Sequence, residues 1–148
     1  MKRAFKMEYL HPTGERSSIK MIPYTSQFRE QYKAIYNDCY HEMREALKIE
    51  PYDFIQDDSF FEKGMDSVYL LVDGQEMIGS VALNGNEIDD LIVSRSYQHR
   101  GYGRDTLLWA LEHIGSDSAI LHVAEWNKRA IDLYKNTGFE ITETIVIG

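Results

Sequence analysis

The spacing of hydrophobic residues along the chain predicts several helices. Between residues 26 and 47, apolar side chains recur every three or four positions, and this period is typical of a helix with one buried face. Pro51 then prevents that helix from continuing. Further helices are expected over residues 58–63, 102–114 and 127–136.

Short runs of strand-forming residues, separated by turn residues, predict a β-sheet. Asp73-Gly74 and Asn84-Gly85 lie between three such runs, which should form an antiparallel meander. The strand–helix–strand unit that follows should add a parallel pair joined by a right-handed crossover. Strands are expected over residues 68–72, 77–83, 87–93, 119–124 and 139–147, with a short strand at 19–24 and an added edge strand at 5–10.

Length and charge indicate a single domain over residues 1–148 and limit its partners. The chain of 148 residues has 16 basic and 24 acidic residues, which gives a net charge of −8. Such a surface repels nucleic acid and anionic membrane, so neither is expected as a partner. No apolar run approaches the roughly 18 residues needed to span a bilayer, and the N-terminal segment lacks the apolar core of a signal peptide. A cytoplasmic location is therefore expected.

Cysteine and acidic residues add two further expectations. Cys39 is the only cysteine, and its place on an apolar helix stripe indicates a small core residue and not a nucleophile. Acidic residues gather between positions 50 and 66, where they form either a solvated connection or a collar that attracts a cationic substrate. No spacing of potential ligands matches a metal site, so no metal is expected.

The sequence QHRGYG at residues 98–103 is the strongest motif of the chain. Glycines at a helix start let several backbone N–H groups point toward one anion, and Arg100 and Arg104 flank that point. The motif is either a pocket for phosphate or pyrophosphate or an ordinary loop before a helix. A dinucleotide fingerprint is excluded because Thr106 stands where its third glycine would be, and the Gly-Lys-Ser/Thr triplet of a P-loop does not occur.

Three spaced features resemble the GCN5-related N-acetyltransferase (GNAT) superfamily. The pattern Gln-x-x-Gly-x-Gly follows the strand end DLIV at residues 90–93, and it precedes Asn127 and the segment YKNTGF at residues 134–139. The resemblance implies an α/β fold, also classed as α+β, with a mixed and mostly antiparallel sheet. It further implies a splayed parallel strand pair, flanking helices, and acetyl-CoA as the acyl donor.

The resemblance also implies which residues bind this donor. In the family, main-chain N–H groups around the glycine motif hold the pyrophosphate. The matching residues here are Gln98, His99, Arg100, Gly101, Tyr102, Gly103 and Arg104. The pantetheine arm pairs with the preceding strand, where Leu91, Ile92 and Val93 match, and the N–H near Leu91 would polarise the thioester carbonyl. Asn127 would contact the cofactor arm and also suits the N-cap of its helix.

Acetyl transfer to an amine further needs a proton donor and a proton acceptor. The resemblance assigns the donor to Tyr134, whose hydroxyl would protonate the departing thiolate; ordinary packing is the competing interpretation. Glu87 has the spacing from the motif that the base glutamate has in the histone-modifying branch. Asp89 shares its strand face, whereas Asp90 faces the other way unless a bulge re-aims it. His122 is a further candidate, although a lone strand histidine is more typical of a satisfied core residue, and these acids could simply decorate a strand end in solvent.

Together these patterns predict an acetyl-CoA-dependent N-acetyltransferase, monomeric or homodimeric. It would move the acetyl group to a primary amine of a cationic small molecule or peptide, by direct attack in a ternary complex. One alternative is a non-catalytic acyl-CoA-binding GNAT-like module for sensing or assembly, and another is transfer of a longer acyl group. The first 60 residues, where the family builds acceptor specificity, match nothing specific.

Overall fold

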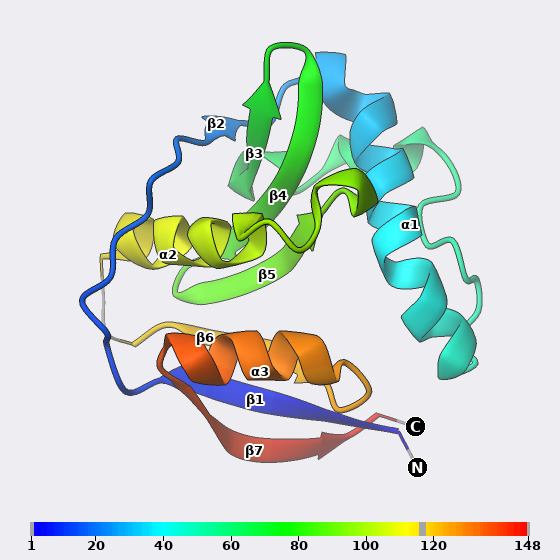
Figure 1. The fold of residues 1–148 in the computed structure, drawn as a ribbon. Helices are drawn as coiled ribbons and strands as arrows, with labels where there is room; N and C mark the ends of the chain where they lie inside the picture. The colour runs from blue at the N-terminus through cyan, green and yellow to red at the C-terminus, as the bar shows by residue number, and fades with distance from the viewer. Residues whose placement is uncertain (1, 116–117, 148) are drawn as a thin grey trace.

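A computed structural model describes residues 2–115 and 118–147, and in these residues the chain forms one 7-stranded sheet with helices on both faces (Figure 1). The strands are β1 (Arg3–Tyr9), β2 (Ile22–Pro23), β3 (Val68–Asp73), β4 (Glu76–Asn84), β5 (Glu87–Val93), β6 (Ile120–Ala124) and β7 (Phe139–Val146). Their order is β2-β3-β4-β5-β6-β1-β7. Neighbouring strands are antiparallel except β5 and β6, which are parallel. The predicted fold class is therefore confirmed.

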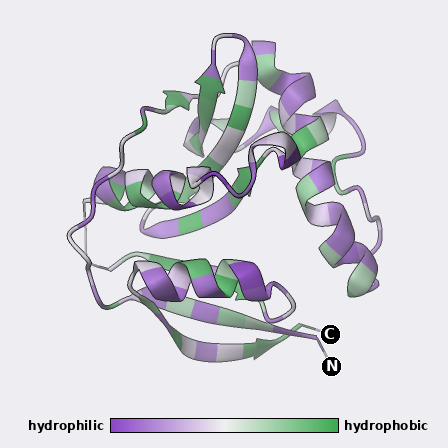
Figure 2. Cartoon of the chain, in the orientation of Figure 1, coloured by the Kyte–Doolittle hydropathy of each residue, from purple (hydrophilic) through white to green (hydrophobic). Residues whose placement is uncertain are grey.

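Helices pack on both faces of this sheet. They are α1 (Arg29–Ala46), α2 (Tyr102–Ile114) and α3 (Lys128–Thr137), with short 3₁₀ segments η1 (Ser26–Phe28), η2 (Asp58–Glu62), η3 (Met65–Ser67) and η4 (Arg95–Tyr97). α1 packs into a core cluster that contains Leu70 and Ile92, whereas α2 and α3 share a second cluster with Ile88 and Leu121. Hydrophobic and hydrophilic residues alternate along α2 and α3 (Figure 2), because one side of each is buried. In the described residues, no helix has the length and hydropathy to cross a membrane.

One strand prediction was wrong in its placement, and another was too long. The segment at residues 5–10, predicted as an added edge strand, is β1, and it lies inside the sheet between β6 and β7. Its apolar side chains pack into the core, with Met7 fully buried opposite Leu121. The strand predicted at residues 19–24 shortens to Ile22–Pro23 at the sheet edge. Pro23 has no N–H for a ladder, which is why such a residue is confined to edges.

β5 is distorted in two ways that open the sheet. Its parallel pairing with β6 involves only Glu87 and Ile88, so the later residues of β5 diverge from β6. The register with β4 shifts between Ser80 and Ala82, opposite Asp90. Asp90 has a φ of 48°, a left-handed conformation that aspartate tolerates better than most residues. The bulge and the divergence leave the edge of β5 facing open space instead of another strand.

Candidate functional site

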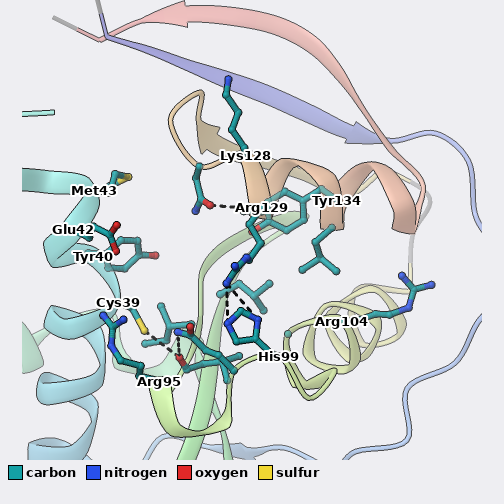
Figure 3. Close-up of a pocket in the computed structure, with 18 of the residues that line it drawn as sticks. Cys39, Tyr40, Glu42, Met43, Arg95, His99, Arg104, Lys128, Arg129 and Tyr134 are labelled. Carbon is teal, nitrogen blue, oxygen red and sulfur yellow. Dashed lines mark hydrogen bonds between the residues drawn. The ribbon is translucent and has the colours of Figure 1, made fainter. Parts of the chain in front are cut away.

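A cavity of about 690 Å³ lies beside the divergent end of β5, between α1, the start of α2 and the start of α3 (Figure 3). Its walls include most residues that the sequence assigned to donor binding and catalysis. These are Leu91, Ile92, Val93, Gln98, His99, Gly101, Gly103, Arg104, Asn127 and Tyr134. The glycine motif, the strand before it and the later asparagine and tyrosine are therefore brought together around one cleft.

Four predicted site residues are not in the cavity wall. Arg100 holds its guanidinium 5.4 Å from the ring centroid of Tyr97, and Tyr102 packs against the same ring. Glu87 and Asp89 lie on β5 before the bulge. A main-chain role for Arg100 and Tyr102 does not require their side chains to face the cleft, because only their N–H groups are invoked.

The start of α2 provides backbone N–H groups at the cleft. Gly101 is the N-cap, with a φ of 88°, and no side chain caps the helix. His99 also has a positive φ, of 66°. The first N–H groups of a helix have no partner within the helix, and the helix dipole favours negative charge there. This geometry suits a phosphate or pyrophosphate group.

Three basic residues in the cavity wall were missed by the sequence analysis: Arg95, Lys128 and Arg129. Arg129 Nη1 lies 3.0 Å from His99 Nε2, which joins the start of α3 to the glycine motif. Arg95 pairs with Asp38 at 3.2 Å. The adjacent Lys128-Arg129 pair, directly after the predicted Asn127 cap, is the sequence signal that could have revealed part of this set.

Arg129 is expected to contribute to binding of a phosphorylated donor. Replacing it with glutamine should raise the Kd for acetyl-CoA about 5-fold at low salt, and less at high salt, because exposed charge pairs are screened. Calorimetric titration at two salt concentrations checks this. Lys135→Gln on the same helix removes an equal charge outside the cleft and should leave the Kd unchanged. Equal effects of both variants would contradict a specific contact.

Two polar residues of the motif have partners that limit their roles. Gln98 Nε2 donates to the Val93 carbonyl at 3.0 Å, so its side chain fixes the motif to β5. Arg104 is paired with Glu15 and donates to Thr137 Oγ1 at 3.4 Å. Beyond the motif, Asn127 Oδ1 accepts from the Ala130 N–H at 3.2 Å, so the predicted N-cap is present.

Cys39 forms part of the α1 side of the cavity and is partly buried. Its Sγ donates to the Val93 carbonyl at 3.2 Å. Burial raises the pKa of this thiol to about 11. Because the nucleophile is the thiolate, a thiol with this pKa is a poor nucleophile at neutral pH.

Tyr134 lies on α3, across the cavity from Tyr40 of α1 (Figure 3). Its side chain is buried, and burial raises its pKa to about 12. Within the described part of the chain, its hydroxyl has no hydrogen-bond partner. A protonated hydroxyl at neutral pH, at the wall of a cleft, can act as a proton donor.

A separate acidic group occupies the start of β5. Asn84 Nδ2 donates to Asp89 Oδ2 at 2.8 Å, and Glu87 Oε2 lies 3.8 Å from His122 Nδ1. Partial burial, and then the neighbouring Asp89, raise the pKa of Glu87. The His122 side chain is 38% exposed, so His122 is not a core residue.

Acids of the segment at residues 50–66 have local partners. Asp53 lies 2.9 Å from His41, Asp58 lies 3.6 Å from Arg29, and Asp57 caps η2. These contacts favour the interpretation of a solvated connection. In the described residues, no group of three or more His, Cys, Asp or Glu side chains is placed to hold a metal ion.

Solved structures confirm the fold at low sequence identity. A GNAT-family protein from Novosphingobium aromaticivorans is 15% identical with a TM-score of 0.65; the match covers 97% of this chain and 61% of that one. The chain therefore spans about three fifths of that relative. PH1933 from Pyrococcus horikoshii is 20% identical with a TM-score of 0.69, with coverage of 88% and 94%. PaiA N-acetyltransferase from Thermoplasma acidophilum, solved with coenzyme A, is 16% identical with a TM-score of 0.67, with coverage of 84% and 91%.

Sequence comparisons give the family. No curated protein sequence matches the chain significantly. The family model for the acetyltransferase (GNAT) family matches residues 29–139, a segment that contains α1, the glycine motif and α3. Because this match covers most of the chain, the protein belongs to the GNAT family of acetyltransferases.

Proposed function

We propose that this chain is an acetyl-CoA-dependent N-acetyltransferase that acetylates a primary amine by direct attack in a ternary complex. The observation that carries the proposal is the cleft beside the divergent end of β5. The start of α2, which no side chain caps, and the buried Tyr134 both line this cleft. The coenzyme A complex of the PaiA N-acetyltransferase, a protein of the same fold, supports the choice of donor.

The donor is bound mainly by main-chain groups. N–H groups of residues 98–104 hold the pyrophosphate, and the basic Arg129 and Lys128 attract its charge. The edge of β5 at Leu91–Val93 pairs with the pantetheine arm, and Asn127 contacts the same arm. The Leu91 N–H polarises the thioester carbonyl, and one such positioned donor contributes about 3 kcal/mol to transition-state stabilisation.

Two proton transfers complete the reaction. An alkylammonium with a pKa of about 10 must lose a proton before its nitrogen can attack. Tyr134 gives its hydroxyl proton to the leaving thiolate, and its raised pKa keeps that proton available at neutral pH. The first candidates from the sequence for accepting the first proton are Glu87 and Asp89, with Asp90 and His122 as alternatives. Because Glu87 and Asp89 do not line the cavity, either would act through water.

The proposal is tested by a screen of amines with acetyl-CoA, measured as release of the CoA thiol. We expect turnover with cationic primary amines and none with acceptors that lack an amine. Turnover confined to neutral or anionic acceptors would overturn the proposal of a cationic acceptor, but the proposal of an acetyltransferase would stand. Failure of acetyl-, succinyl- and longer acyl-CoAs to raise the Tm would refute both the enzyme and the non-catalytic acyl-CoA-binding module.

A further inference from the structure

The β5 bulge changes the direction of one carboxylate. Alternation along a strand would put Asp90 on the opposite face from Asp89. With its φ of 48°, Asp90 instead points toward α1, where its Oδ1 accepts hydrogen bonds from Tyr40 at 3.0 Å and Tyr36 at 3.5 Å. Two tyrosine hydroxyl groups therefore hold Asp90, and the alternation of residues along the strand does not predict these contacts.

The surroundings of Asp90 suit a cation. The ring centroids of Tyr36 and Tyr40 lie 4.7 Å apart, and that of Phe60 lies 5.5 Å from that of Tyr36. The carboxylate therefore contacts the hydroxyl groups at the edge of a cluster of aromatic rings. In the described residues, Asp90 has no Lys, Arg or His partner. A partly buried carboxylate without a cationic partner is costly, and a bound ammonium would offset that cost through charge pairing and cation–π contact.

Asp90 does not itself line the cavity, but two residues beside it do. Tyr40, which donates to it, lines the cavity from α1, and the following residue Leu91 lines the cavity from β5. Tyr134 lines the same cavity from α3, across from Tyr40 (Figure 3). Glu87 and Asp89 have no such connection to the cavity wall.

We propose that Asp90 binds the ammonium group of the acceptor and accepts its proton, with the rings of Tyr36 and Tyr40 beside the adjacent carbon. This inference rests on the proposed acetyltransferase function. It also names the acceptor class: primary alkylamines without a carboxylate next to the nitrogen. A neighbouring carboxylate on the acceptor would be repelled by Asp90 and by Asp89 on the same strand.

The proton balance is complete with groups of the cleft. Asp90 takes one of the three protons of the ammonium, and the freed lone pair forms the C–N bond at the thioester carbonyl carbon. The C–S bond breaks, and the thiolate takes the hydroxyl proton of Tyr134. A second proton of the nitrogen then restores that hydroxyl. The products are an amide, the free thiol, and one proton that leaves Asp90 for solvent.

The same assignment fixes the direction of the pH dependence. The ionisable groups that face Asp90 are Tyr32, Tyr36 and Tyr40 of α1, and Asp89 of its own strand. Burial raises the pKa of Asp90; the Tyr40 hydrogen bond opposes this, and the charge of Asp89 adds to it. Because the ionised form accepts the proton, kcat/KM should fall as pH decreases through this raised pKa.

The test is the Asp90→Asn variant, assayed with acetyl-CoA and the most active primary alkylamine of the screen. Asparagine adopts positive φ readily, so the variant should fold. We expect kcat/KM for the amine to fall about 100-fold, the acid limb of the pH profile to disappear, and the Tm increase with acetyl-CoA to persist. Tyr40→Phe removes one hydrogen bond to Asp90 and should lower kcat/KM less, by about 5-fold.

Asp132→Asn is the matched control, because it removes an exposed carboxylate of α3 outside the cavity and should leave kcat/KM unchanged. If the wild type is active and the Asp90→Asn variant has nearly the same kcat/KM, the inference is overturned and the proposed function stands. A larger loss in Glu87→Gln or Asp89→Asn would overturn it equally. No thiol release by the wild type with any amine would overturn the proposed function and, with it, this inference.

Discussion

The Tyr134→Phe variant should lose about 100-fold in kcat while its Kd for acetyl-CoA stays unchanged. The substitution removes only the hydroxyl group, so the ring still fills its buried position and still packs 6.1 Å from the ring of Phe139. The hydroxyl is expected to act on the departing thiolate, a charge that exists in the transition state and not in the bound donor. Interactions of that kind raise kcat without changing ground-state affinity, so losing one lowers kcat alone.

Thiol release under saturating substrates gives kcat, and calorimetric titration gives the Kd. Tyr9→Phe is the matched control: Tyr9 also packs on Phe139, at 5.2 Å, but lies outside the cavity wall. It should retain wild-type kcat. A Tyr134→Phe variant with unchanged kcat would show that another group protonates the thiolate. Acetyl-CoA binding with no turnover in either the variant or the wild type would favour the non-catalytic binding module.

The Gly138→Ala variant should be the least stable of the glycine substitutions. Gly138 ends α3 with a φ of 117°, and its carbonyl accepts N–H groups of Leu10 and His11. A Cβ at this position would lie 2.2 Å from the His11 carbonyl oxygen, so the backbone after β1 would have to move. Strain and clash together should lower the free energy of unfolding by about 3 kcal/mol or more, and the Tm by about 10 °C.

Urea unfolding measures this loss. Gly74→Ala is the matched control, since Gly74 also has a positive φ, of 62°, but its Cβ would meet nothing within 4 Å. The Gly74→Ala substitution should lower the free energy of unfolding by about 1 kcal/mol, which is the cost of the backbone strain alone. Equal losses in the two variants would contradict the close docking of the segment after β1 against the end of α3.

Local patterns were sufficient for the elements around the cleft. The predicted bounds of α2 and β5 agree with the structure, because glycines border the helix and a turn precedes the strand. Residues of the glycine motif, Asn127 and Tyr134 line one cavity, a grouping that the resemblance to the GNAT superfamily implied. Each of these signals lies within a short stretch of sequence.

The features that sequence reasoning missed depend on long-range pairing. The interior place of β1 requires its partners β6 and β7, more than a hundred residues away, and an alternating pattern does not reveal which strands flank it. The contact of Asp90 with Tyr36 and Tyr40 likewise depends on the register between β4 and β5. Residue types alone allow a bulge in β5 but do not fix its position.

The most direct measurement is an amide ¹H–¹⁵N NMR titration of the wild-type chain with acetyl-CoA. The N–H groups of residues 98–104 and of Leu91–Val93 should show the largest shifts, since these main-chain groups are proposed to bind the pyrophosphate and the pantetheine arm. The N–H groups beside the second, smaller hollow at His11 and Glu140 should not change. Shifts confined to that hollow, or no shifts at saturating acetyl-CoA, would contradict a donor site at the end of β5.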